Sequence, residues 1–145
     1  MNIQKFQYNE FPKDEVFRNA INFLYVHLEQ FGDSKEDIEK AFDYAFSEEP
    51  GKGGYILVGY EQKEIIGAVV INCTGMQGYI PENILVYIAI HKNYRGKGYG
   101  KQLLIRAIEE SEGNIALHVE NNNPAKFLYD KMGFETKYLE MRLEK

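Results

Sequence analysis

The sequence predicts a single α/β domain over residues 1–145, and three observations support this fold class. Apolar residues recur at helical spacing in the first third of the chain, an uninterrupted apolar run occupies residues 84–90, and a loop with three glycines follows that run. The chain has 145 residues, of which 44% are hydrophobic, so it is long enough to bury one core. No second domain is expected.

Two helices are expected first. Residues 17–31 and residues 34–46 each place apolar side chains on one helical face. These positions are Ala20, Phe23, Leu24 and Leu28 in the first segment and Ile38, Ala41, Phe42 and Ala45 in the second. Ser34 belongs to the residue types preferred at a helix N-cap, so it marks the start of the second helix.

The middle of the chain predicts three strands. Residues 55–60 and 64–72 have the composition of two strands, and a tight turn near Gln62 would join them into an antiparallel hairpin. Residues 84–90 are all apolar, which is typical of a central strand buried on both faces.

A glycine-rich loop follows the central strand and opens a helix. Its residues are Arg95, Gly96, Lys97, Gly98, Tyr99 and Gly100. Glycines let backbone N–H groups approach an anion, and the positive end of the helix dipole points at the same place, so the arrangement predicts a phosphate site. The loop lacks the Lys-Ser/Thr ending of a P-loop, and Leu103 stands where a dinucleotide-binding pattern needs glycine. Taken alone, the same loop is equally compatible with a solvated turn.

A further strand and helix are predicted near the carboxyl end. Residues 114–119 resemble a short strand, after which Asn123 and Pro124 supply an N-cap and a proline in the first helical position. Gly133 would end that helix. Residues 138–143 alternate in polarity and predict a closing strand.

Composition narrows the partners and the compartment. The formal net charge of −5 argues against nucleic acid as a partner, because binding a phosphate backbone usually needs a basic surface. Cys73 is the only cysteine, so a reducing cytoplasm is expected and a cysteine-rich metal site is not. The three histidines are too dispersed for a zinc site, so no metal is predicted. The chain has neither a leader-like amino terminus nor about 18 consecutive apolar residues, so no membrane association is expected.

The loop and the last helix together resemble two linked motifs of the GNAT acetyltransferase family. The family's loop pattern, Arg/Gln-x-x-Gly-x-Gly/Ala, is matched by Arg95, Gly98 and Gly100. Its second pattern, Asn-x-x-Ala-x-x-x-Tyr-x-x-x-Gly-Phe, is matched by Asn122, Ala125, Tyr129, Gly133 and Phe134. The resemblance covers about residues 84–134, and it implies a mixed, mostly antiparallel sheet of six to seven strands. About four helices would flank this sheet, which would be splayed between its fourth and fifth strands.

The resemblance also implies an acetyl-CoA-dependent N-acetyltransferase that acts by direct attack of a primary amine in a ternary complex. The glycine-rich loop would hold the pyrophosphate of acetyl-CoA, and Asn122 would hydrogen-bond the pantetheine arm. The main chain of Ile88, Ala89 and Ile90 would pair with that arm. A bulge in the central strand, common in the family, would turn one N–H toward the thioester carbonyl and stabilise the oxyanion.

The resemblance further implies that Tyr129 is the general acid that protonates the departing thiolate, although its place on an apolar helix face also fits core packing. Two candidates remain for the general base. His118 alternates with Leu117 and Val119 and so points to the opposite face of its strand, and Glu82 lies just before the central strand. Ordinary surface roles fit both candidates equally well.

The acceptor stays open, because the resemblance implies that variable segments before the central strand build its pocket. Both a small-molecule amine and a protein amine are compatible with the sequence. An alternative function is a non-catalytic acyl-CoA-binding sensor or interaction domain, against which the presence of Tyr129 counts. A homodimer formed through edge strands is a further hypothesis.

Overall fold

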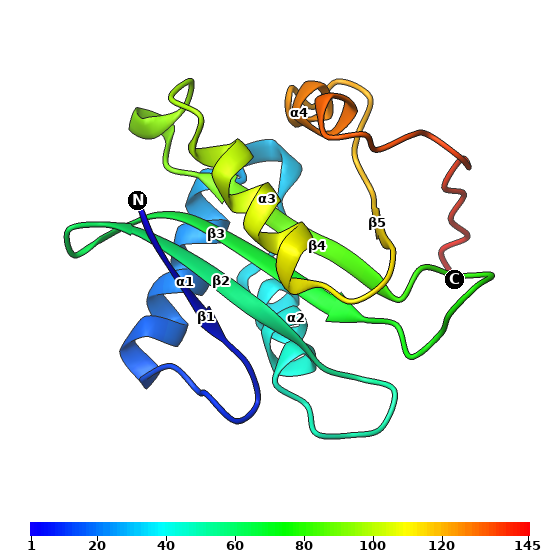
Figure 1. Ribbon diagram of the computed structural model, residues 1–145, viewed down its shortest axis with the longest axis horizontal. Helices are drawn as coiled ribbons and strands as arrows, with labels where there is room; N and C mark the ends of the chain where they lie inside the picture. The colour runs from blue at the N-terminus through cyan, green and yellow to red at the C-terminus, as the bar shows by residue number, and fades with distance from the viewer.

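The computed structural model describes residues 1–145 and contains one five-stranded sheet with helices on both faces (Figure 1). The strands are β1 (Asn2–Phe6), β2 (Gly54–Glu61), β3 (Glu64–Cys73), β4 (Asn83–Ile90) and β5 (Ile115–Leu117). The helices are α1 (Asp14–His27), α2 (Lys35–Ala45), α3 (Tyr99–Glu110) and α4 (Ala125–Lys131), with 3-10 helices η1 (Glu29–Phe31) and η2 (Lys92–Tyr94). The strand order is β1-β2-β3-β4-β5, antiparallel throughout except for the parallel pair β4–β5.

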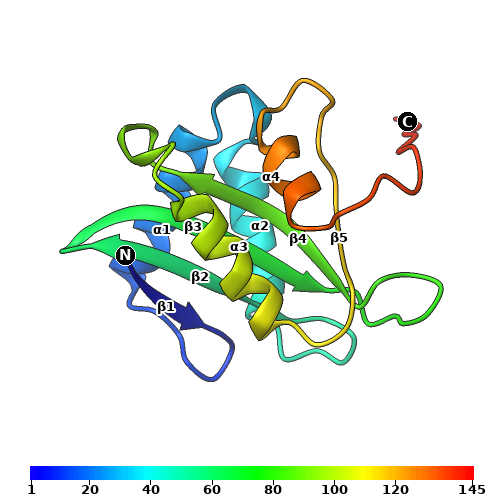
Figure 2. The same cartoon turned by 45° about the horizontal axis from the view of Figure 1, so that its top comes forward.

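The sheet separates two cores. On one face α1 and α2 pack through side chains such as Leu24 and Phe42, and on the other α3 packs through Leu103 and Leu104. Figure 2 shows α3 and α4 together on the near side of the sheet, with α1 and α2 behind it. The predicted mixed, mostly antiparallel sheet with four helices is therefore confirmed.

The sheet has five strands and not the six to seven expected. Residues 138–143, predicted as a closing strand, form no regular structure, and Leu139 is 87% exposed. Their alternating pattern finds no sheet edge to pair with, so it cannot bury its apolar face. The strand β1 was not expected, because its side chains are exposed or half-buried and its sequence carries only weak apolar alternation.

The first helix is displaced from its predicted range of residues 17–31. It begins at Asp14 and ends at His27, because Glu29 adopts a left-handed backbone conformation with φ of 55° that no α-helix can contain. The second helix is confirmed, and Ser34 caps it by accepting the Asp37 N–H at 3.2 Å.

The hairpin of β2 and β3 is confirmed, with Gln62 in its turn at φ of 54°. The central strand β4 differs from the prediction of burial on both faces, since every second side chain is only half-buried. The half-buried and buried side chains alternate along the whole strand, so one set of alternate positions is covered less completely than the other.

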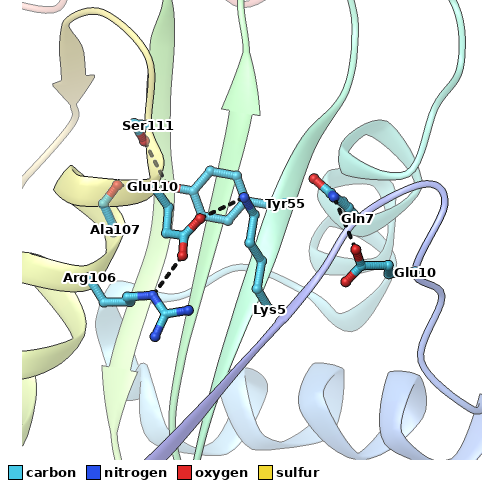
Figure 3. Close-up of polar contacts among 8 residues, drawn as sticks. All are labelled: Lys5, Gln7, Glu10, Tyr55, Arg106, Ala107, Glu110 and Ser111. Carbon is cyan, nitrogen blue, oxygen red and sulfur yellow. Dashed lines mark hydrogen bonds and ion pairs between the residues drawn. The ribbon is translucent and has the colours of Figure 1, made fainter.

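Polar contacts fasten the carboxyl end of α3 to the first two strands (Figure 3). The Tyr55 hydroxyl donates to the Ala107 carbonyl at 2.7 Å and lies 2.7 Å from Ser111 Oγ. Lys5 Nζ forms an ion pair with Glu110 Oε2 at 2.8 Å. These contacts fix α3 at the end remote from the glycine-rich loop. None of the helices combines the length and apolar character needed to span a bilayer.

Candidate active site in the split of the sheet

The sheet opens between β4 and β5. The two strands pair only at Asn83–Ile115, Ile84–Ala116 and Leu85–Leu117, after which β4 continues to Ile90 without a strand on that edge. The backbone N–H and C=O groups along this free edge need hydrogen-bond partners. An extended ligand can supply them as a missing strand would.

A β-bulge lies where the two strands separate. The pairing of β4 with β3 passes from Leu85–Ile71 to Tyr87–Val70, so Val86 is the extra residue. A bulge leaves one residue out of the ladder and bends its strand. The bulge expected in the central strand is therefore present, at the first residue beyond the β5 pairing.

The glycine-rich loop leads from β4 into α3 as predicted. Gly96 and Gly98 have φ of 77° and 85°, in the left-handed region that favours glycine, and a Cβ added to either would meet nothing within 4 Å. Gly98 is the N-cap of α3, and no side chain caps the helix there. The first N–H groups of α3 therefore face open space with the positive end of the helix dipole behind them, which suits an anion.

The side chain of Arg95 lies away from this anion position. Its Nε donates to the Ile90 carbonyl at 3.1 Å, its Nη2 to the His27 carbonyl at 2.8 Å, and its Nη1 pairs with Glu29 Oε1 at 3.1 Å. Lys97 Nζ lies 5.3 Å from the centre of the Tyr94 ring. In this arrangement the backbone of the loop, and not the Arg95 side chain, is placed to contact an anion at the start of α3.

Tyr129 of α4 lies within the core that borders the free edge. Its side chain is 7% exposed and belongs to the cluster that includes Leu85, with Ile88 and Ile90 packed against it. Burial raises the pKa of Tyr129 to about 12. Its hydroxyl has no hydrogen-bond partner in the protein, yet no fully enclosed side-chain oxygen lacks one, so the hydroxyl reaches solvent.

Glu82 lies at the closed end of the split. Its Oε2 accepts the Asn114 N–H at 2.9 Å, just before β5 begins. The neighbouring Asn83 is 4% exposed, and its Nδ2 donates to the Glu112 carbonyl at 2.6 Å. These contacts hold the start of β5 against the start of β4.

His118 and Asn122 are exposed residues on the segment that leads from β5 to α4. The strand predicted over residues 114–119 ends at Leu117, so His118 lies one residue beyond it, at the mouth of the split. Asn122 lines a surface hollow with Lys126, and its neighbour Asn123 accepts the Ala125 N–H at 2.9 Å. The N-cap of α4 is Pro124 and not Asn123 as predicted, so the helix begins one residue later, and the Asn123 side chain bonds its first N–H from the position before the cap.

A sequence profile described as an acetyltransferase (GNAT) domain matches residues 52–136 of this chain. The chain belongs to the GNAT acetyltransferase family. The resemblance inferred from the two motifs is thereby confirmed.

The GNAT protein is also similar to a protein of known activity over part of its sequence, and to solved structures in its fold. It is 37% identical over 78 residues to the ribosomal protein bS18 alanine N-acetyltransferase of Haemophilus influenzae, a match covering 51% of this chain and 50% of that protein. The chain thus spans about half the length of this relative. Among solved structures, it resembles an aminoglycoside 6'-N-acetyltransferase of Acinetobacter haemolyticus, with a TM-score of 0.69, 15% identity and coverage of 100% and 98%. A transcriptional regulator of Bacillus halodurans has a TM-score of 0.68, 16% identity and coverage of 99% and 100%.

Two features of this GNAT protein were missed from the sequence. The Tyr87 hydroxyl donates to Asp33 Oδ2 at 2.6 Å, which ties the strand β4 to the segment between α1 and α2. Glu29, in that same segment, holds a left-handed conformation. The nearby sequence signal was Ser34, which marks the start of the second helix and says nothing of these contacts. No group of three or more His, Cys, Asp or Glu side chains is placed to hold a metal ion.

Proposed function

We propose that this GNAT protein is an acetyl-CoA-dependent N-acetyltransferase that acylates a primary amine by direct attack in a ternary complex. The observation that carries the proposal is the Tyr129 hydroxyl, which has no partner in the protein although its ring is buried beside the free edge of β4. Buried tyrosines with a structural role usually hydrogen-bond their hydroxyls, as Tyr55 and Tyr87 do here. An unpartnered phenol at the split is available to donate a proton to a ligand.

Acetyl-CoA, the acetyl donor, would lie in the split. Backbone N–H groups of residues 95–100 would hold its pyrophosphate at the N-terminus of α3, which lacks a side-chain cap. The main chain of Ile88, Ala89 and Ile90 would pair with the pantetheine arm, since this edge of β4 has no strand partner. Asn122 would hydrogen-bond the arm from the β5 side.

In the reaction, the amine nitrogen attacks the thioester carbonyl carbon, and the C–N bond forms as the carbonyl oxygen becomes an oxyanion. The bulge at Val86 would present a backbone N–H to that oxyanion. The general base takes a proton from the attacking nitrogen, and collapse of the intermediate breaks the C–S bond as Tyr129 donates its proton to the sulfur. A proton from solvent then restores the Tyr129 phenol. Because the pKa of Tyr129 is raised to about 12, the phenol is protonated at neutral pH. The same apolar surroundings would also raise the pKa of the coenzyme A thiol, because burial disfavours its thiolate. The difference in pKa between the Tyr129 phenol and this thiol would therefore be smaller than the raised pKa of Tyr129 alone suggests.

For the general base we favour His118 over Glu82. Leu117 and Val119 both pack into the core beneath α3 and α4, so alternation directs His118 to the opposite face, from which an acceptor could approach. The Glu82 carboxylate instead accepts a backbone N–H at the closed end of the split.

The acceptor is proposed to be an amine of a protein or of a small molecule, with a protein α-amine as the first class to test. The Haemophilus influenzae relative is named for an alanine of ribosomal protein bS18. An α-amine has a pKa near 7.7–8.0, against about 10.4 for lysine, so its attacking neutral form needs less help from a base. We expect the protein to act in the cytoplasm, and its assembly as a homodimer stays a prediction.

The test is thiol release from acetyl-CoA with a panel containing an alanine-starting peptide, a lysine-containing peptide, polyamines and an aminoglycoside. Release with one of these amines, strongly reduced in Tyr129→Phe, would support the proposal. Acetyl-CoA that raises the melting temperature without release for any amine would favour a non-catalytic acyl-CoA sensor. Absence of any binding would contradict both functions.

A further inference from the structure

The guanidinium of Arg95 joins three parts of the molecule. It donates to the last carbonyl of β4 at Ile90, to the last carbonyl of α1 at His27, and to the Glu29 carboxylate. Its own backbone opens the glycine-rich loop that precedes α3. A displacement of this loop would therefore move the planar Arg95 guanidinium and disturb its contacts at the end of α1.

Glu29, which pairs with Arg95, has an unfavourable backbone conformation. Its φ of 55° is rare for a residue with a Cβ and costs about 1 kcal/mol or more, so the surrounding structure must enforce it. From this conformation the Glu29 carboxylate forms its ion pair with Arg95, and both side chains of the pair are partly exposed. The hydrogen bond from Arg95 to the His27 carbonyl lies two residues away, so Arg95 contacts this segment at two points.

The same segment is anchored a second time to β4. The Tyr87 hydroxyl donates to Asp33 at 2.6 Å, and Tyr87 follows the bulge at Val86 directly. The segment from His27 to Asp33 thus crosses the α1–α2 face of β4, fixed at one end by Arg95 and at the other by Tyr87. It borders the stretch of β4 that β5 leaves free.

We propose that Arg95 is a positioning residue that couples binding of the donor at the glycine-rich loop to the conformation of residues 27–33, the segment beside which the acceptor amine must approach. Phosphate held by the loop fixes the backbone of Arg95, Arg95 then holds the His27 carbonyl and the Glu29 carboxylate, and the acceptor side is ordered before the amine binds. This inference rests on the proposed function.

The experiment is hydrogen exchange of the full chain with and without saturating coenzyme A, following the amides of residues 27–33. In the wild type we expect coenzyme A to slow their exchange several-fold. In Arg95→Gln, which cannot bridge the same three acceptors, coenzyme A at saturation should leave their exchange unchanged. A merely structural role would raise exchange equally with and without the ligand, so the ligand-dependent difference is the decisive quantity.

Two further variants make the test robust. Glu29→Asn removes the ion pair but tolerates a left-handed backbone, so it should fold and also lose the ligand-dependent protection. Lys97→Gln removes a cation from the same loop, and the Lys97 ammonium lies over the Tyr94 ring and not beside residues 27–33. It should weaken coenzyme A binding but keep the protection of residues 27–33 once saturated.

The outcomes separate this inference from the proposed function. If coenzyme A raises the melting temperature of the wild type but leaves residues 27–33 unchanged, the coupling is wrong and the proposed function stands. Full ligand-dependent protection in Arg95→Gln or in Glu29→Asn would likewise overturn it. If coenzyme A does not bind the wild type, the proposed function and the coupling fail together.

Discussion

The two ends of the split in the sheet differ in how β4 satisfies its backbone. At the closed end, Glu82 and Asn83 bind the loop before β5 through side-chain hydrogen bonds, and the two strands pair. At the open end, from Val86 to Ile90, β4 has a bulge and a free edge beside the unpartnered Tyr129 hydroxyl. Both ends belong to one apolar run in the sequence. The comparison teaches that the polar residues Glu82 and Asn83 fix the closed end of the split, and that the apolar run of residues 84–90 does not by itself show where the sheet opens.

The largest expected effect is on chemistry at the open end. Tyr129→Phe removes one hydroxyl that has no partner in the protein, so the fold should be retained while kcat falls by about 100-fold or more, as for loss of a general acid. Thiol-release kinetics would measure kcat, and thermal melting would check the fold. An unchanged kcat would contradict the assignment of chemistry to this end.

The next effect compares the base candidates, one at each end. His118→Gln should lower kcat by about 10-fold or more with little change in stability, because His118 is exposed at the mouth of the split. Glu82→Gln keeps an oxygen that can accept the Asn114 N–H, so it should leave kcat nearly intact. The reverse pattern in the same kinetic assay would move the base to the closed end.

A third effect should appear in stability and not in chemistry. Asn83→Ala removes a buried side-chain amide and leaves the Glu112 carbonyl without its donor, which should cost about 1–3 kcal/mol of unfolding free energy. Urea unfolding would measure the loss. A matched exposed variant, Asn93→Ala, should lower the free energy of unfolding far less. An equal loss in both variants would contradict the claim that the Asn83 hydrogen bonds hold the start of β5 against β4.

The smallest effect concerns the pH dependence of stability through His27, at the end of α1 beside the open end. Burial lowers the pKa of His27 from its ordinary value of 6.5, and the charges of His91, Arg95 and Lys92 lower it further, while Glu29 opposes them. The unfolded chain therefore binds a proton at His27 first, so this contribution to stability is complete above about pH 6.5 and is lost as pH falls below it. Urea unfolding at pH 7.5 and 5.5 should show a smaller drop for His27→Gln than for the wild type.

Local patterns in the sequence predicted the parts of the site that are themselves local. The glycines of the loop need left-handed backbone at Gly96 and Gly98, and the start of α4 was predicted to within one residue from Asn123 and Pro124. The contacts of Arg95 with His27 and Glu29 join residues more than 60 positions apart. Spacing patterns in a sequence relate residues only a few positions apart. The position of the Arg95 side chain could therefore not be predicted, although Arg95 was part of the loop motif.

The lack of long-range information in local patterns also explains why the strand β1 was missed and why a strand was wrongly predicted at residues 138–143. Residues 2–6 pair at an edge with little apolar alternation, whereas residues 138–143 alternate well but find no partner in this chain. Edge pairing depends on what lies alongside, and this information is absent from either segment. The central features were predictable because burial there leaves a dense apolar signature.

The fastening of α3 has a mechanical consequence. Tyr55 and Lys5 hold the helix at its carboxyl end, which restrains it from moving along its axis. We therefore expect any rearrangement on anion binding to occur in the glycine-rich loop between α3 and the end of β4. Through the contact of Arg95 with the His27 carbonyl, such a rearrangement would reach the end of α1 and leave α3 in place.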